Sequence, residues 1–161
     1  MKKSLLLCLA ALMLFACAAG CSQEKNTKNP TCEQVLEAVK EAIGEDDMPM
    51  MTDIDDDAMS ALYGLSDPTA VLEDYRGIVS QMNVRADEIL VMKVKDGEME
   101  AAEAAVSQRQ EDLDATWSQY LPEVYETVKD ARVVKNGNYL LFVVSDDADD
   151  AAEAFDELTK G

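Results

Sequence analysis

The chain has 161 residues, with 33 acidic and 14 basic side chains, a formal charge of -19 and no histidine. Because 48% of the residues are hydrophobic, the composition is that of a folded protein and not of a disordered acidic tail. The missing imidazole excludes histidine-based nucleophilic sites and histidine-ligated zinc, and the excess of acid argues against binding to nucleic acid. Nothing in the composition indicates a cofactor.

The first 21 residues have the pattern of an export signal. Lys2 and Lys3 precede an uncharged apolar run over residues 5–15. This run is too short to span a bilayer of about 30 Å as a permanent helix. Residues 18–21 then read AAGC, with small side chains directly before Cys21.

This ending resembles the lipobox of bacterial lipoproteins, in which the cysteine is acylated with diacylglycerol and becomes the first residue after cleavage. The resemblance implies a signal peptide over residues 1–20 and a lipid on Cys21. Cys17 is the alternative, because residues 14–17 read LFAC with leucine at the favoured position. Cys21 is preferred because polar residues begin directly after it.

Residues 21–30 are expected to form the acylated cysteine and a flexible tether. Residues 22–30 read SQEKNTKNP, and such a segment reaches at most about 30 Å from the membrane. Cys32 is then the one cysteine left beyond the anchor, so no intramolecular disulfide is expected. These features predict a chain anchored at the extracytoplasmic face of the cell membrane.

The remaining residues, 31–161, are expected to form a single domain that begins with three helices. Thr31 and Gln34 form a capping box for a helix that ends at Gly44. A second short helix is predicted from Asp55 or Asp56 to Tyr63. A third is expected over residues 67–75, with proline at its first position.

The second half of the chain alternates strands and helices. Strands are predicted over residues 78–82 and 88–95, a long helix over 98–119, a helix from Pro122, a hairpin over 132–144 with Asn136-Gly137 as its turn, and a helix over 148–159. Strand pairs close in sequence favour an antiparallel sheet. The expected fold class is therefore α+β, with about four strands in two hairpin-like pairs and helices packed over one face in two layers.

Several short motifs resemble one family. They are residues 48–51 (MPMM), 62–65 (LYGL), 82–89 (MNVRADEI), 108–110 (QRQ), 120–123 (YLPE) and 137–139 (GNY). The pattern over residues 32–160 is similar to the domain of unknown function 4358, a group of lipoproteins mostly from anaerobic Gram-positive gut bacteria. The resemblance implies the anchor and the single domain, and it brings no activity, ligand or catalytic residue.

Two acidic segments are candidate functional sites. Asp53, Asp55 and Asp57 have the spacing that opens a calcium-binding EF-hand loop. Ala58 and Gly64 stand where that loop needs glycine and glutamate, so these three acids are only weak metal candidates and helix capping explains them better. A second cluster over residues 146–153 begins the last helix, where acids complement the helix dipole.

Other residues have a structural interpretation beside a functional one. Cys32 lies at a helix start that would lower its pKa, but it is expected to pack as a small hydrophobe. The methionines of residues 48–51 are expected to cover the core rather than bind a soft metal, and Trp117 and Tyr120 to lie in the core rather than stack on a ligand. Arg109 falls on an apolar helix stripe, where it could extend to solvent, face an anionic ligand or pair with a carboxylate. The structural ion pair is the favoured prediction.

The function expected from the sequence is that of a membrane-anchored surface lipoprotein that binds an envelope protein and has no catalytic residues. The alternatives are a carboxylate-dependent envelope hydrolase, which needs two acids but no histidine, and a cation-binding domain.

Overall fold

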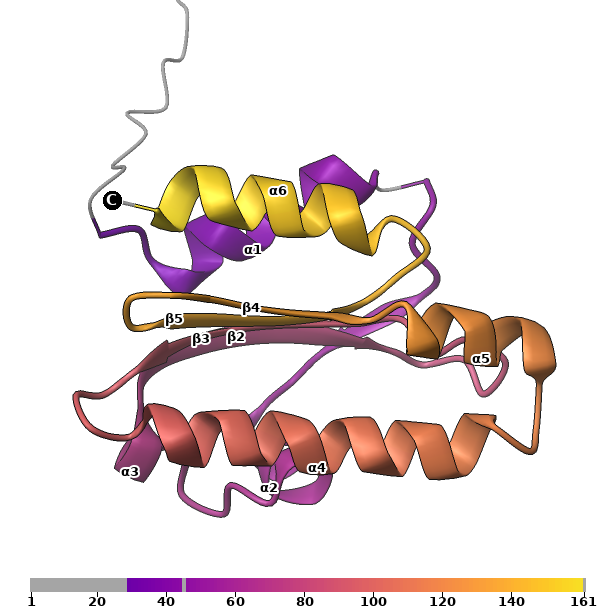
Figure 1. Ribbon diagram of the computed structural model, residues 1–161, viewed down its shortest axis with the longest axis horizontal. Coiled ribbons are helices and arrows are strands. Elements are labelled where there is room, and N and C mark those ends of the chain that lie inside the picture. Colours follow the sequence, from indigo (N-terminus) through magenta and orange to yellow (C-terminus); the bar gives the residue numbers. More distant parts are fainter. Residues whose placement is uncertain (1–28, 45, 161) are drawn as a thin grey trace, which may run out of the picture.

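The computed structural model describes residues 29–44 and 46–160, which form a five-stranded antiparallel sheet with helices on both faces (Figure 1). The elements in chain order are α1 (Cys32–Ile43), β1 (Met51–Asp53), α2 (Asp56–Tyr63), α3 (Pro68–Val71), β2 (Leu72–Ser80), β3 (Glu88–Val94), α4 (Met99–Trp117), α5 (Pro122–Lys129), β4 (Arg132–Asn136), β5 (Tyr139–Val144) and α6 (Ala148–Thr159). The strand order is β1-β2-β3-β5-β4, so β3 lies at the centre of the sheet.

The strand register defines two ends of the sheet. At one end, Met51 pairs with Ser80 and Glu88 pairs with Val144. The loop between β2 and β3, residues 81–87, lies at this end. The opposite end holds the β4–β5 turn, and Pro30 lies there because its carbonyl accepts a hydrogen bond of 2.6 Å from the Tyr139 hydroxyl.

The sheet separates two hydrophobic cores. Alternate residues of β3 point to opposite faces, so that Leu90 and Met92 enter one core while Ile89 and Val91 enter the other. Helices α1 and α6 cover the second face, and α2, α3 and α4 cover the first (Figure 1). Because β3 and β5 are apolar on both faces, each face requires its own helical layer.

The predicted helix caps of α1 and α2 form. Thr31 and Gln34 make the reciprocal capping box of α1, and Asp55 caps α2 through the amide of Ala58. Gly64 ends α2 with φ of +68°, a left-handed conformation that glycine adopts at little cost.

The α+β class and the antiparallel sheet are confirmed. The structure differs from expectation in having a fifth strand, β1, and in placing helices over both faces of the sheet. Three residues are too few for β1 to show an alternating pattern. The apolar runs of β3 and β5, which fit two buried faces, indicate the second helical layer.

Two element boundaries also differ. The third helix ends at Val71, and the chain enters β2 at Leu72 because residues 72–80 pair along the length of β3. The hairpin turn is Gly137-Asn138 instead of Asn136-Gly137, since Asn136 pairs with Tyr139 and Gly137 takes a φ of +57°.

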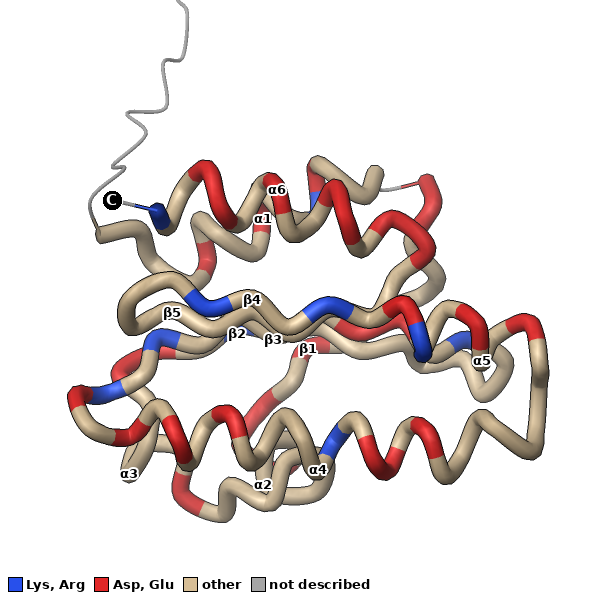
Figure 2. Tube along the Cα trace, in the orientation of Figure 1, with Lys and Arg blue, Asp and Glu red and all other residues tan. Residues whose placement is uncertain are grey.

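Acidic residues occur in every layer of the molecule (Figure 2). They include the first turns of α1, α2, α4, α5 and α6, where negative charge complements the helix dipole. Among the residues described, no helix is long and apolar enough to cross a membrane.

Candidate functional site

A buried polar cluster joins three elements on the α4 face of the sheet. Glu88 is the first residue of β3, and its side chain is fully buried. Arg109 comes from the middle of α4, between the buried residues Val106 and Leu113, and Tyr63 is the last residue of α2. The cluster therefore ties both helices to the central strand.

The geometry of the cluster is that of an ion pair with a third hydrogen-bond donor. Nε and one terminal nitrogen of Arg109 donate to Oε2 of Glu88 at 2.9 Å and 2.6 Å. The hydroxyl of Tyr63 donates to Oε1 of the same carboxylate. Charged hydrogen bonds of this kind are roughly twice as strong as neutral ones, and a buried carboxylate needs them because its burial is costly.

The electrostatics of the cluster follow from its burial. Burial by itself would lower the pKa of Arg109, but the carboxylate of Glu88 outweighs it and the pKa is raised. Burial, followed by the charge of Glu88, raises the pKa of Tyr63 well above its ordinary value. Arg109 thus stays charged and Tyr63 stays a hydrogen-bond donor, and together they hold the carboxylate in place.

A second acid–base pair lies directly before the cluster in sequence. Asp87 is buried, and its two oxygens accept hydrogen bonds from Nε and a terminal nitrogen of Arg85 at 2.8 Å and 2.7 Å. In the described part of the chain, no buried side-chain nitrogen or oxygen lacks a hydrogen-bond partner. The buried polar groups of these two pairs therefore satisfy one another's hydrogen bonds.

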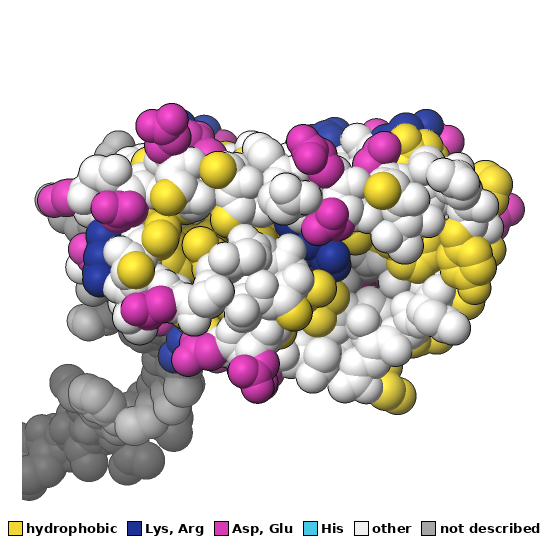
Figure 3. Space-filling model, turned by 90° about the horizontal axis from the view of Figure 1, so that it is seen from below, with side chains coloured by type: hydrophobic (Ala, Val, Ile, Leu, Met, Phe, Trp, Pro, Cys, Tyr) yellow, Lys and Arg dark blue, Asp and Glu magenta, His cyan; other side chains and the backbone are white. Residues whose placement is uncertain are grey.

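A hollow of about 500 Å³ lies between α4 and α5. Figure 3 shows the face of the molecule on the α4 side of the sheet, where hydrophobic side chains adjoin charged ones. Leu113, Val128 and Phe142 supply apolar walls, and Glu111 and Asp114 bring two carboxylates to the lining. The hydroxyl of Tyr125 donates to Asp114, and this hydrogen bond raises the pKa of Tyr125.

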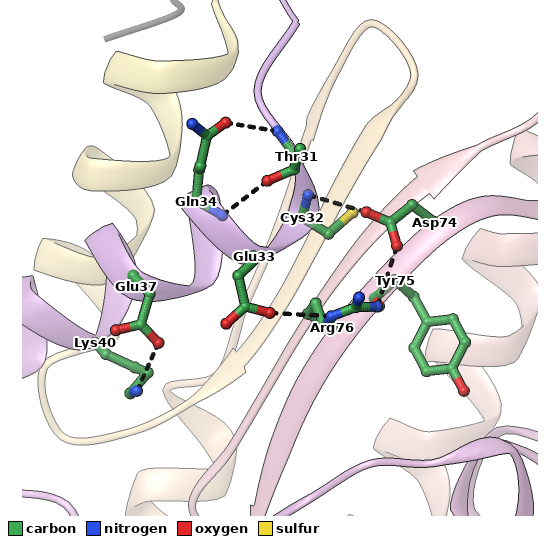
Figure 4. Close-up of polar contacts among 9 residues, drawn as sticks. All are labelled: Thr31, Cys32, Glu33, Gln34, Glu37, Lys40, Asp74, Tyr75 and Arg76. Carbon is green, nitrogen blue, oxygen red and sulfur yellow. Dashed lines mark hydrogen bonds and ion pairs between the residues drawn. The ribbon is translucent and has the colours of Figure 1, made fainter. Parts of the chain in front are cut away.

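The start of α1 carries a third polar group of residues (Figure 4). The amide of Cys32 donates to Asp74 on β2 at 3.2 Å, and Arg76 forms ion pairs with Glu33 at 3.0 Å and with Asp74 at 3.2 Å. These contacts fasten α1 to β2.

Cys32 itself is buried in the core between the sheet and helices α1 and α6. Burial, and then the carboxylate of Asp74, raise the pKa of the Cys32 thiol. The helix start therefore does not lower this pKa, because desolvation and a nearby negative charge oppose the dipole. The prediction that Cys32 packs as a small hydrophobe is confirmed.

The family comparison covers most of this architecture. A model of the family described as Domain of unknown function (DUF4358) matches residues 44–145. The chain belongs to the DUF4358 family. No curated protein and no solved structure matches it.

The stretch matched to DUF4358 is shorter than residues 32–160, over which the motifs suggested the resemblance. It contains all five strands, the cluster of Tyr63, Glu88 and Arg109, and the hollow beside α4. Helices α1 and α6 lie outside it. In this DUF4358 protein, the matched stretch therefore holds the sheet and the α4 layer.

In this DUF4358 protein, the three aspartates that were weak metal candidates lie at the end of β1 and at the start of α2. Asp53 ends β1, the side chain of Asp55 accepts from the amide of Ala58 at 2.9 Å, and Asp57 lies in the first turn of α2. In residues 29–44 and 46–160, no group of three or more acidic or cysteine side chains is placed to hold a metal ion.

The other predicted residues divide between core and surface. Arg109 forms the expected ion pair, and Trp117 is buried. Tyr120 is exposed, contrary to expectation, because α4 ends at Trp117 and the chain turns before Tyr120 can enter the core. Met48 and Met51 pack against the core as predicted, whereas Met50 is exposed.

The sequence did not indicate Glu88 and Tyr63 as partners of Arg109. Glu88 is a charged residue directly before the apolar run of β3, which is a usable signal. Tyr63 has no such signal apart from its place before a helix-ending glycine. The lipid-attachment candidates Cys21 and Cys17 lie outside the described residues.

Proposed function

We propose that this DUF4358 protein is a lipoprotein, anchored through Cys21 at the extracytoplasmic face of the cell membrane, whose folded part binds an envelope protein without catalysis. The observation that carries the proposal is the amino-terminal sequence, in which two lysines, an apolar run and AAGC follow one another. Two acyl chains hold a protein stably at a membrane, since each buried methylene contributes about 0.8 kcal/mol.

The arrangement of the folded part supports this proposal. Pro30 lies at one end of the sheet, held by the Tyr139 hydroxyl, so a tether attached there leaves the opposite end free to meet a partner. The fully buried carboxylate of Glu88 is held by Arg109 and Tyr63, and these contacts pack α2 and α4 on the sheet.

The test of the anchor is the fate of the chain in the bacterial cell. We expect the chain to fractionate with membranes and to be degraded by protease added to intact cells. Cys21→Ala should release it from the membrane, whereas the matched variant Cys17→Ala should not. Retention of Cys21→Ala, or protection of the chain from external protease, would contradict the proposal.

The hollow beside α4 favours one second candidate, a carboxylate-dependent hydrolase. Glu111 and Asp114 both line it, and a glycosidase needs two carboxylates flanking its substrate. This candidate requires that the purified chain hydrolyse cell-wall glycan and that Glu111→Gln and Asp114→Asn each abolish the activity. If neither variant changed the rate of hydrolysis, Glu111 and Asp114 would be excluded as the catalytic carboxylates.

A further inference from the structure

Three exposed hydrophobic side chains lie on two adjoining segments at one end of the sheet. Met50 is 69% exposed, and Met82 and Val84 are each 43% exposed. The two segments are joined because the amide of Gln81 donates to the carbonyl of Met50 at 2.9 Å. We refer to Met50, Met82 and Val84 as the distal apolar patch.

The patch lies at the end of the sheet opposite Pro30. Met50 adjoins the start of β1, and Met82 and Val84 belong to the loop between β2 and β3, whereas Pro30 is held at the start of β5. Figure 3 shows hydrophobic side chains gathered at the end of the molecule that carries α5, and exposed Tyr120 belongs to the turn before that helix. A strand of six residues such as β5 separates the two ends by about 20 Å.

This position decides between a membrane and a protein as the partner, on the basis of the proposed lipid anchor. With a lipid on Cys21, the tether joins the fold at the end of the sheet opposite the patch, so the patch is the part of the sheet farthest from the point of attachment. The anionic surface of a bacterial membrane would also repel this chain, whose formal charge is -19 even with Lys2 and Lys3 of the signal segment included. Both arguments favour a protein over lipid.

The charges around the patch define the chemistry of that protein. Exposed Asp46 and Asp47 precede Met50, and exposed Asp146 and Asp150 follow β5 at the same end. Two of the basic side chains described at this end, Arg85 and Arg132, are paired with Asp87 and Asp149 at 2.7 Å. The patch is therefore an apolar centre with an acidic rim, and a complementary surface is apolar with Lys and Arg around it.

We propose that the distal apolar patch is a docking site for a basic, amphipathic segment of another envelope protein. Met side chains suit this role because they are flexible and adapt to different apolar surfaces. Long-range attraction between the acidic rim and the basic segment speeds the encounter, and burial of Met50, Met82 and Val84 then slows dissociation.

The experiment uses two helical peptides of equal positive charge as probes, one with Lys and Leu on opposite faces and one with Gln in place of Leu. The protein is the chain as the bacterial cell processes it, kept in solution or, if mass spectrometry finds a lipid, in phosphatidylcholine nanodiscs. The identity of the amino terminus is therefore known before binding is measured, so failure of the anchor and failure of the docking site are distinguishable.

We expect the Lys/Leu peptide to bind more tightly than the Lys/Gln peptide and to perturb the amide signals of residues 50 and 81–84. The triple variant Met50→Ser/Met82→Ser/Val84→Ser should bind the Lys/Leu peptide with about tenfold lower affinity. This loss corresponds to about 1.4 kcal/mol of binding free energy from apolar burial. Val133→Ser is the matched control, because Val133 is 42% exposed but lies on the edge strand β4.

Three outcomes would overturn the proposal. The first is equal binding of both peptides, which would show attraction by charge alone. The second is a loss of binding in Val133→Ser equal to that in the triple variant. The third is a dimer of this chain in sedimentation that the triple variant dissociates, because the patch would then be occupied by a second copy.

Discussion

The guanidinium of Arg109 donates two hydrogen bonds to one oxygen of the fully buried Glu88 carboxylate, at 2.9 Å and 2.6 Å. Loss of one partner of such a pair leaves an uncompensated buried charge. We therefore expect Arg109→Met to lower the free energy of unfolding by about 3–5 kcal/mol, measured by urea denaturation. The matched control is Arg76→Met, which removes ion pairs with Glu33 and Asp74 on the surface and should cost at most about 1 kcal/mol.

We also expect that the polar side chains of this cluster can be replaced by apolar ones if all of them are replaced together. The triple variant Tyr63→Phe/Glu88→Leu/Arg109→Met leaves no buried charge or unpaired hydroxyl in the cluster. It should recover most of the stability lost in Arg109→Met. A triple variant as unstable as Arg109→Met would show that the cluster contributes more than mutual charge compensation.

The hydroxyl of Tyr63 is the third donor to this cluster, through Oε1 of Glu88. Tyr63→Phe removes the hydroxyl and keeps the ring, which packs edge-on against Phe142 with 6.5 Å between ring centroids. We expect a loss of about 1.5–3 kcal/mol, the range for a hydrogen bond to a charged group. Urea denaturation measures it, and a variant of unchanged stability would show that the hydroxyl contributes nothing.

The buried thiol of Cys32 should make the folded protein less stable in alkali. Its pKa is raised in the folded state by burial and by Asp74, while its ordinary value is 9.0. Above pH 9 the unfolded chain releases the thiol proton and the folded chain keeps it, so the free energy of unfolding falls as pH rises. The slope should steepen from about 0.7 kcal/mol per pH unit at pH 9 toward about 1.4 kcal/mol per pH unit above pH 10.

Urea denaturation of the wild type and Cys32→Ala across this pH range measures the effect. Cys32→Ala should have lower stability at pH 7 but a flatter dependence between pH 9 and 10. Tyr63, whose pKa is also raised, adds a further loss in both proteins only above its ordinary value of 10.0. A slope that persists unchanged in Cys32→Ala would exclude the thiol as its source.

The stability of an Asp55 variant distinguishes a helix-capping role of this residue from a cation-binding role. Its side chain accepts a hydrogen bond from the amide of Ala58 at 2.9 Å, so Asp55→Ala should cost about 1 kcal/mol of stability. The loss should be the same with and without millimolar calcium, and Asp57→Ala, which removes no cap, should cost less. Thermal denaturation measures both, and a loss that appears only with calcium would indicate a cation site.

Local signals in the sequence were sufficient for most of the fold. The capping box of Thr31 and Gln34, the cap of Asp55 and the glycine stop at Gly64 each depend on residues within one helix turn. The hairpin of β4 and β5 was also predictable, although its turn was displaced by one residue. These features are local, and their physics is therefore visible in a short stretch of sequence.

The remaining features depend on contacts between distant segments. Strand β1 exists because residues 51–53 meet β2, and its length gives no pattern of its own. Arg109 was predicted to need a carboxylate, but 33 acidic residues offered no way to select Glu88 before the strand and the helix were packed together. The exposure of Tyr120 likewise depends on where α4 ends.

Mass spectrometry of the protein purified from bacterial membranes tests the proposed anchor most directly. We predict that the chain begins at Cys21 and carries a diacylglycerol on its thiol. Its mass should otherwise be that of residues 21–161. A chain that begins at Cys17 would move the lipid to the alternative residue. An unmodified amino terminus, or a chain that retains residues 1–20, would contradict the account.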